Sequence, residues 1–278
     1  MKGRRPGSRN PLTVLRNWAA FLDGIGSLVV ALCLAVVRNL TPFYSTRTTL
    51  PLHIRGVEGT IRCRPGTTDF HTLLQVWDDG EYRLAKEFVQ EPVRAVVDLG
   101  SNIGMSVSYF ATLWPEAQII AVEPDPENAA LARRNLKRYV EGGRVVIESC
   151  FAGSQPGFAR PVRPQPRGQN AVRMRRLQPQ EDDRGVTVKT MPQLLEHLPP
   201  GPVDFVKCDI EGSERDIFAG PLPWLRRVRA MVVELHELEP QWLLDTIDEA
   251  GAVVEKCHVQ PVIGYDLALL WARMAWPS

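Results

Sequence analysis

The sequence lacks any cluster of cysteines. Its five cysteines are far apart, and no two form a Cys-x-x-Cys pair: Cys33, Cys63, Cys150, Cys208 and Cys257. An odd number of widely spaced cysteines favours neither a disulfide framework nor a zinc site. Most of them stand in apolar, strand-like stretches, so we expect buried free thiols in a reducing compartment, namely the cytoplasm.

The chain also lacks an excess of charge of one sign. Its 33 basic and 32 acidic residues give a net charge of +1, which excludes the overall basic field typical of nucleic-acid-binding proteins. A basic insertion stands out at about 154–185, where five prolines accompany seven arginines between Arg160 and Arg184. We expect a mobile loop there, either simply solvated or clamping an anionic substrate or membrane headgroup. No aromatic residue is interleaved with these arginines, so the insertion does not indicate nucleic-acid binding.

The chain has no uncharged hydrophobic run that is clearly long enough to span a membrane. Residues 18–37 carry one charge, Asp23, over a length close to the roughly 20 residues of a span. Basic residues are more numerous before this stretch than after it, which would place the rest of the chain outside the cytoplasm, and no signal-peptide cleavage site follows. The sequence therefore favours a helix that lies on a membrane, or against the protein or a partner, over a spanning segment.

The chain divides into three parts. Residues 1–40 hold the basic N-terminus and the apolar helix, residues 41–90 form an N-terminal extension, and residues 91–278 form the main domain. Within the extension, short strand-like pieces predict a hairpin, and Thr68 or Asp69 is a candidate N-cap for a helix over 70–77.

Strands and helices alternate from residue 94 onwards. Val/Ile-rich strands are predicted at 94–98, 118–122, 144–149, 203–209 and 229–234. Helices are predicted at 103–113, 126–139, 213–219 and 240–250, the second capped by Asp125 with Pro126 at its first position. Near-continuous apolar strands between helices indicate an α/β fold with a parallel sheet covered on both faces. The last two strands, 252–256 and 267–271, are joined by a short segment and predict an antiparallel hairpin at one edge.

A third glycine is missing from the turn after the first strand. The turn runs from Asp98 to Gly104, and its two glycines are four residues apart without the G-x-G-x-x-G spacing of dinucleotide-binding proteins. A nicotinamide-dependent oxidoreductase is therefore the weaker alternative. The next strand ends in Glu123, a position from which a carboxylate accepts hydrogen bonds from ribose hydroxyls. The two strand ends together indicate a nucleoside-bearing cofactor.

A second acidic turn follows the strand at 203–209. Asp209, Glu211 and Glu214 crowd around one glycine, and the carboxyl ends of parallel strands share one edge of the sheet. Asp209 or Glu211 can orient or deprotonate an acceptor hydroxyl, or hold a divalent ion, whereas Glu214 has the simpler reading of a helix cap. His236 ends the next strand and is either a base or a structural residue. The other four histidines have no metal-ligand spacing, so no metal site is predicted.

Three segments of the chain resemble the FkbM family of S-adenosylmethionine-dependent methyltransferases. They are Val97–Gly104, Val122–Pro126 and Phe205–Glu214, in this order. The resemblance implies a Rossmann-like, seven-stranded methyltransferase sheet with S-adenosyl-L-methionine as cofactor. It also implies O-methylation of a hydroxyl on a sugar, glycan or polyketide-like small molecule.

The resemblance further implies roles for particular residues. The methionine part of the cofactor would lie among Asp98, Gly100, Ser101, Asn102 and Gly104. The ribose would bind to Glu123, and the adenine would lie between Pro124 and Phe151. The acceptor site and its base would be drawn from Asp209, Glu211 and His236. The insertion and the N-terminal helix lie outside the shared core, so a non-catalytic, membrane-associated scaffold stays open as an alternative.

Overall fold

The computed structural model describes residues 11–40, 48–162, 173–177, 185–262 and 267–276. The predicted basic segment at 1–10 and a large part of the predicted insertion lie outside these ranges. The main domain, by contrast, is described almost throughout, including every strand of its central sheet.

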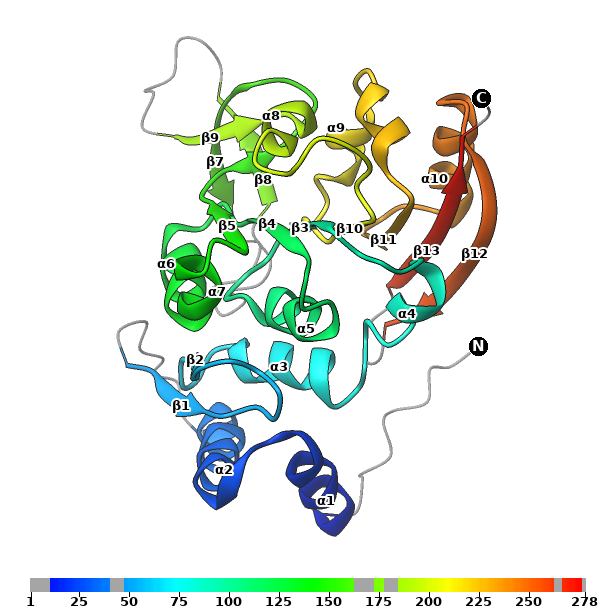
Figure 1. The fold of residues 1–278 in the computed structure, drawn as a ribbon. Coiled ribbons are helices and arrows are strands. Elements are labelled where there is room, and N and C mark those ends of the chain that lie inside the picture. The colour runs from blue at the N-terminus through cyan, green and yellow to red at the C-terminus, as the bar shows by residue number, and fades with distance from the viewer. Residues whose placement is uncertain (1–10, 41–47, 163–172, 178–184, 263–266, 277–278) are drawn as a thin grey trace.

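A seven-stranded sheet crosses the middle of the molecule in the order β12-β13-β11-β10-β3-β4-β5 (Figure 1). Its strands are β3 (Ala95–Leu99), β4 (Gln118–Val122), β5 (Val145–Glu148), β10 (Phe205–Cys208), β11 (Ala230–Leu235), β12 (Val253–Pro261) and β13 (Ala268–Ala275). The five neighbouring strands β5, β4, β3, β10 and β11 are parallel, whereas β13 is antiparallel to both β11 and β12. The predicted α/β fold and its antiparallel edge are therefore confirmed.

Helices cover both faces of this sheet (Figure 1). One face carries α3 (Asp69–Trp77), α4 (Ala85–Phe88), α5 (Met105–Leu113), α6 (Pro126–Asn135) and α7 (Lys137–Glu141). The other carries α8 (Met191–Leu195), α9 (Glu214–Phe218), the 3-10 helix η1 (Pro223–Arg227) and α10 (Pro240–Glu249). Neighbouring residues of one strand enter opposite cores: Val96 packs with Phe110 of α5, and Val97 belongs to the cluster around Leu243 of α10. This is why the strands are apolar without alternation.

The predicted cap of α6 is confirmed, but that of α3 is different. Asp125 accepts hydrogen bonds from the backbone N–H groups of Glu127 and Asn128 at 2.9 and 3.0 Å, with Pro126 beginning the helix. At α3, Thr68 occupies the N-cap position without a side-chain cap bond. The neighbouring Asp69 instead accepts three hydrogen bonds from Arg64. Arg64 lies five residues earlier in the chain, and no capping pattern includes that position.

The apolar N-terminal stretch forms two helices rather than one. They are α1 (Pro11–Phe21) and α2 (Gly24–Leu40), and the chain turns between them at Gly24, where φ is +75°. Trp18 and Leu22 are buried, whereas Ile25 is 82% exposed because the turn restarts the helical rotation. Among the described residues, no helix combines the length and apolar character needed to cross a membrane.

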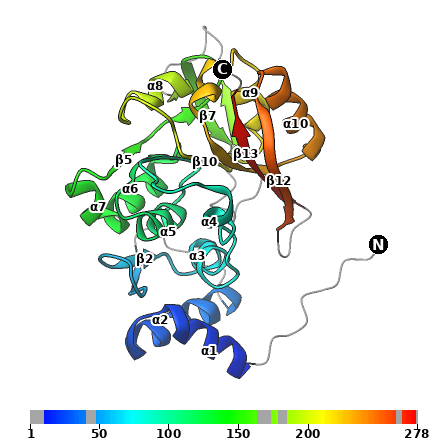
Figure 2. The ribbon, with the colours of Figure 1, turned by 45° about the vertical axis from the view of Figure 1, so that its right-hand side comes forward.

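Both helices pack against the protein at the end away from the sheet (Figure 2). Trp18 meets the ring of Phe70 edge-on at 5.2 Å, and Ser27 Oγ accepts a hydrogen bond from the backbone of His53 at 2.9 Å. The predicted hairpin of the extension is present as β1 (Leu50–Leu52) and β2 (Ile61–Cys63), paired antiparallel. One side of the N-terminal helices is therefore covered by the chain itself.

Two described stretches of the predicted insertion loop are strands. β7 (Gly157–Val162) and β8 (Arg173–Arg176) join β6 (Phe151–Ala152) and β9 (Val186–Lys189) in a second sheet of order β6-β9-β7-β8. The prediction of a loop is wrong for β7 and β8. The arginines contact acids of the same chain: Arg176 pairs with Asp216 at 2.7 Å, and Arg173 pairs with Glu237 at 3.0 Å. The high arginine content made the segment look like a solvated loop, although Phe151, Ala159 and Val188 form a small apolar cluster on this sheet.

All five cysteines are free. Three are buried as expected, namely Cys63, Cys150 and Cys208, but Cys33 and Cys257 are exposed. The prediction of buried thiols is wrong for these two. Cys33 lies on the outer side of α2, and Cys257 lies on the edge strand β12, where alternate side chains face outward.

Candidate active site

A cavity of about 340 Å³ opens where β3, β4, β10 and β11 end at their carboxyl sides. Open α/β sheets bind ligands at this edge. The structure brings nine of the predicted site residues to its wall: Gly100, Ser101, Asn102, Glu123, Pro124, Phe151, Asp209, Glu211 and His236. Asp98 and Gly104 are not on the wall. The two acidic turns thus face one space.

The turn after β3 is held tightly between its two neighbouring strands. The backbone N–H groups of Gly100 and Ser101 both donate to the carbonyl of Val122 at 2.9 Å. Gly100 has a φ of +81°, and a Cβ at this position would overlap the backbone carbonyl of Asp209. Only glycine satisfies both conditions, because other L-residues rarely adopt this φ and would need space that β10 fills.

Glu123 joins this turn to the start of α6. One carboxylate oxygen accepts from the backbone of Asn102 at 2.8 Å, and the other accepts from the backbone of Asp125 at 2.9 Å. The residue exposes 4% of its surface, and burial raises the pKa of its carboxyl to about 7. The oxygen that accepts from Asp125 also accepts from Asn128 Nδ2 at 3.5 Å, so the other oxygen keeps a lone pair for a ligand at the cavity wall.

Asp98 and Gly104 support the turn from behind. Asp98 is fully buried and pairs with Lys207 Nζ at 3.2 Å, while the same ammonium donates to the carbonyls of Leu99 and Gly100 at 3.1 and 2.6 Å. Burial would lower the pKa of Lys207, but Asp98 and Asp209 outweigh it and raise the pKa. Gly104 is the N-cap of α5. Both Asp98 and Gly104 therefore lie behind the turn, and neither lines the cavity.

His236 lies between two acids of the turn after β10. Its Nδ1 is 2.9 Å from Glu214 Oε1, and its Nε2 is 3.4 Å from Glu211 Oε2. Burial would lower the pKa of His236, but its hydrogen bonds to Glu211 and Glu214 raise the pKa to about 11. An imidazolium has no free lone pair, so at neutral pH proton acceptance in this arrangement falls to a carboxylate. Glu211 itself adopts a left-handed φ of 56°, an unusual conformation for a side chain of this size.

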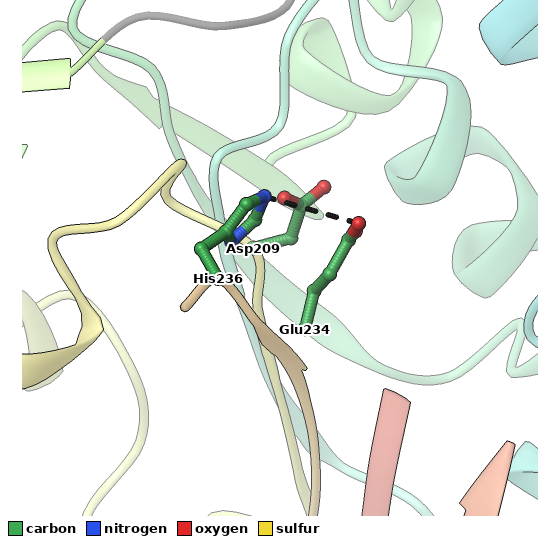
Figure 3. A group of neighbouring side chains, drawn as sticks. All are labelled: Asp209, Glu234 and His236. Atoms are coloured by element: carbon green, nitrogen blue, oxygen red, sulfur yellow. Dashed lines mark ion pairs between the residues drawn. The ribbon is translucent and has the colours of Figure 1, made fainter. Parts of the chain in front are cut away.

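Two acids of this cavity were missed by sequence reasoning. Glu234, at the end of β11, is 9% exposed, and burial together with Asp209 raises its pKa above the ordinary value. Glu81, in the turn after α3, has a pKa raised by burial to about 7. Glu234 had a readable signal, because it stands two residues before His236 and so faces the same side of the strand (Figure 3). Glu81 had none, since only tertiary packing brings it to the sheet.

A family model described as the methyltransferase FkbM domain matches residues 98–256, more than half of the chain. The chain belongs to this family. It is 27% identical over 143 residues to Methyltransferase 1 of Beauveria bassiana, a match that covers 45% of this chain and 57% of that relative. It is 26% identical over 178 residues to 31-O-demethyl-FK506 methyltransferase FkbM of Streptomyces tacrolimicus, covering 53% of this chain and 67% of that protein. The chain thus spans little more than half of the Beauveria relative.

Solved methyltransferase structures align with this chain at low identity. The METTL16 MTase domain is 14% identical with a TM-score of 0.46, covering 98% of this chain and 95% of that chain. Precorrin-6y C5,15-methyltransferase from Geobacter metallireducens GS-15 is 16% identical with a TM-score of 0.40, covering 70% of this chain and 89% of that chain. The expected methyl donor, S-adenosyl-L-methionine, follows from the family, and the sheet order above establishes the Rossmann-like fold.

The residues around the cavity fit this cofactor. Ser101 Oγ is buried and has no hydrogen-bond partner among the described residues, so it is available to a polar ligand. Glu123 offers acceptor lone pairs at the β4 end, and Pro124 and Phe151 give that end apolar walls. The carboxylates of Asp209 and Glu211 make the opposite side acidic, which suits a positively charged sulfonium.

Proposed function

We propose that this chain is an S-adenosylmethionine-dependent O-methyltransferase acting on a hydroxyl of a sugar, glycan or polyketide-like small molecule. One observation carries the proposal: Asp209 and Glu211 face the same cavity as the glycine turn and Glu123. A cofactor site and a pair of candidate proton acceptors therefore share one enclosed space. The name of the Streptomyces relative, 31-O-demethyl-FK506 methyltransferase FkbM, supports a hydroxyl as the acceptor.

In this proposal the cofactor lies against the ends of β3 and β4. Gly100, Ser101 and Asn102 would contact its methionine part, Glu123 would accept from the ribose hydroxyls, and the adenine would lie between Pro124 and Phe151. Asp98 and Gly104 act as positioning residues behind the turn. When bound, the cofactor supplies an electrophilic methyl group on a sulfonium.

The acceptor side of the cavity has to hold a hydroxyl in line with that methyl group. Most of the acceleration in such a displacement comes from aligning the reacting atoms. Well-aligned intramolecular reactions reach effective molarities of roughly 10⁵–10⁸ M. Asp209 or Glu211 takes the proton of the hydroxyl, a contribution of about 10²–10⁴-fold. His236, as a cation between Glu211 and Glu214, keeps the Glu211 carboxylate beside the cavity.

Calorimetry with S-adenosylmethionine and S-adenosylhomocysteine tests the cofactor site. Both are expected to bind the wild-type chain, and Glu123→Gln is expected to weaken both because it removes acceptor capacity at the ribose. The matched control is Glu127→Gln, four residues later and exposed at the start of α6, which should bind as wild type does. Absence of binding of either compound to the wild-type chain would overturn the proposal.

Transfer of a labelled methyl group to extracted small molecules and glycans tests catalysis. We expect label in a hydroxyl-derived methyl ether, and its loss in Asp209→Asn or Glu211→Gln. If S-adenosylhomocysteine binds but no acceptor is labelled, the scaffold alternative replaces the catalytic proposal. Label found on nitrogen or carbon would contradict O-methylation while leaving the family assignment intact.

We also propose that α2 rests on an anionic membrane surface. Ile25, Val29, Leu32 and Val36 follow one another at helical spacing and expose 82, 53, 41 and 52% of their surface. Five basic residues precede this stripe, and no acid occurs before Asp23. An apolar stripe that positive charge precedes in the sequence is complementary to anionic lipid, as in interfacial helices.

Vesicle sedimentation tests this placement. The full chain should sediment with vesicles of equimolar phosphatidylserine and phosphatidylcholine, less so with phosphatidylcholine alone, and less so after Ile25→Ser with Val29→Ser. Val253→Ser, which changes an exposed valine on β12, serves as the control. The proposal fails if the chain sediments with neither kind of vesicle. It also fails if light scattering shows that the chain is a dimer and that the serine variants are monomers.

A further inference from the structure

Three side chains of different kinds converge at the ends of β10 and β11. One ligand atom each from Asp209, Glu234 and His236 lies within 4.8 Å of the other two. Figure 3 shows the two carboxylates and the imidazole turned toward one another. We propose that these three side chains bind a divalent cation of the Mn²⁺-to-Zn²⁺ group. No residue role given so far requires them to converge in this way.

Glu234 is the observation that points to a ligand. The residue exposes 9% of its surface, and its carboxylate accepts no hydrogen bond from the described part of the chain. Its one charged contact is His236 Nε2 at 3.8 Å, beyond hydrogen-bonding reach. A buried carboxylate without hydrogen bonds is strongly unfavourable unless a proton or a cation compensates it. The cation of the proposal provides that compensation.

His236 is oriented as a metal-binding histidine is. Glu214 is completely buried, and its Oε1 lies 2.9 Å from His236 Nδ1, so the Nδ1–H donates to the carboxylate. This hydrogen bond fixes the ring, and Nε2 then lies 3.4 Å from Glu211 Oε2 and 3.8 Å from Glu234 Oε1, on the side of Asp209 and Glu234 (Figure 3). A carboxylate behind the distal ring nitrogen is the usual outer-shell partner of a metal-bound histidine. On binding, the ion takes the place of the Nε2 proton, and that proton leaves to solvent.

The surrounding charge also favours a cation. Six acids lie around two bases, Lys207 and His236; the acids are Glu81, Asp98, Asp209, Glu211, Glu214 and Glu234. A divalent ion bound among these carboxylates would offset part of their negative charge. Two carboxylate oxygens and one imidazole nitrogen are ligands that Mn²⁺ and Zn²⁺ both accept.

Three protein ligands leave positions open for the acceptor. An oxygen bound there has a lowered pKa, so the ion would help Asp209 and Glu211 to obtain a nucleophilic oxygen. This role rests on the proposed methyl transfer. The binding of the ion does not, and it is measured separately from both cofactor binding and activity.

Electron paramagnetic resonance of Mn²⁺ tests the site directly. Full-length wild-type chain should decrease the signal of free Mn²⁺ with one strong site per molecule, and Zn²⁺ should compete. His236→Gln and Glu234→Gln should each weaken binding at least tenfold. Glu214→Gln, which alters the outer partner of His236 and keeps an oxygen to accept from the backbone of Ile210, should weaken it by roughly 10-fold to 100-fold. Glu237→Gln is the matched control, because Glu237 follows His236 directly and its side chain is 78% exposed.

Several results would overturn the proposal. One is the absence of Mn²⁺ binding by resonance together with the absence of Zn²⁺ binding by calorimetry. Another is binding that His236→Gln and Glu234→Gln leave unchanged while circular dichroism shows both variants folded. If the variants unfold, the wild-type chain provides the test. Its Mn²⁺ binding must become stronger as the pH rises, because the ion displaces the Nε2 proton, and binding that does not change with pH overturns the proposal. Binding of S-adenosylhomocysteine in metal-free samples reports on the proposed function alone, so the two failures are distinguishable.

Discussion

At the scale of single residues, the buried carboxyl of Glu123 links stability to pH. Burial raises its pKa to about 7 in the folded chain, whereas the unfolded side chain titrates near 4.3. Between these values the folded state holds the proton and the unfolded state does not. Its contribution to stability is therefore present below the lower pKa and is lost as the pH rises to the upper one.

Glu123→Gln removes this dependence. The wild-type chain should lose about 3 kcal/mol of unfolding free energy, relative to the variant, between pH 4 and pH 8. Urea unfolding of both proteins across this range measures the difference. Glu81 and Glu234 have pKa values shifted in the same direction, but they are common to both proteins and cancel. Parallel stability curves for the two proteins would show that the carboxyl of Glu123 is ionised throughout.

Gly100→Ala should be far more harmful than another glycine substitution with a similar backbone. The left-handed φ of +81° costs an alanine about 1–2 kcal/mol, and the new Cβ also overlaps the carbonyl of Asp209. Gly251→Ala is the control, because its φ is +85° and a Cβ there meets nothing within 4 Å. We expect the first variant to lose clearly more stability and most of its affinity for S-adenosylhomocysteine. Equal losses would mean that β10 moves aside freely.

At the scale of elements, a buried ion pair fastens β2 to α3 and α6. Arg64 and Asp69 are 2 and 0% exposed and lie 2.8 Å apart, and Arg64 also donates to Asn128 Oδ1 at 2.7 Å. Asp69→Asn leaves a buried guanidinium without its counter-charge. The expected loss is about 3–5 kcal/mol of unfolding free energy, measured in urea.

A surface pair provides the comparison for this prediction. Arg94 and Glu116 are 3.5 Å apart, with side chains 61 and 77% exposed. Glu116→Gln should change the unfolding free energy by less than about 1 kcal/mol. If both substitutions had the same small effect, Asn128 and solvent would have to compensate Arg64 adequately, contrary to its burial.

Elements whose signal is local were predicted, and those that depend on distant contacts were not. The runs at β3, β4 and β10 are largely apolar and end in Gly or acidic turns, so these strands and their parallel direction could be inferred from the residues. The strand β8 could not, because Arg173-Met174-Arg175-Arg176 has the composition of a solvated loop and pairs only through β7. Its arginines are neutralised by Asp216 and Glu237, both more than 30 residues later in the chain.

The candidate site divides in the same way. Residues at strand ends were found because strand ends are readable, and Asp209, Glu211 and His236 do line one cavity with Glu123. What the residues could not indicate is the protonation of His236, which depends on Glu214 and Glu211 at 2.9 and 3.4 Å. Electrostatic state is a property of the assembled site, and no spacing along the chain encodes it.

At the scale of the whole molecule, the N-terminal helices share one core with the sheet. Trp18, Leu22 and Leu34 belong to the same buried apolar cluster as Phe110, and through it to Trp271 of β13. A shared core predicts that α1 and α2 unfold together with the methyltransferase domain in a single transition. It also predicts that substitutions on the two sides of these helices have opposite consequences.

Trp18→Ala should lower the unfolding free energy by about 3–5 kcal/mol, since the indole is 6% exposed and its loss leaves a cavity beside Phe70. Ile25→Ala should change it by less than about 0.5 kcal/mol, because that side chain is 82% exposed. Urea unfolding followed by far-ultraviolet circular dichroism measures both. A first, separate transition in Trp18→Ala would show that the helices are a detachable unit. A single transition at a lower urea concentration would show that the buried face of these helices is part of the core. The opposite face, with Ile25, is then held toward solvent.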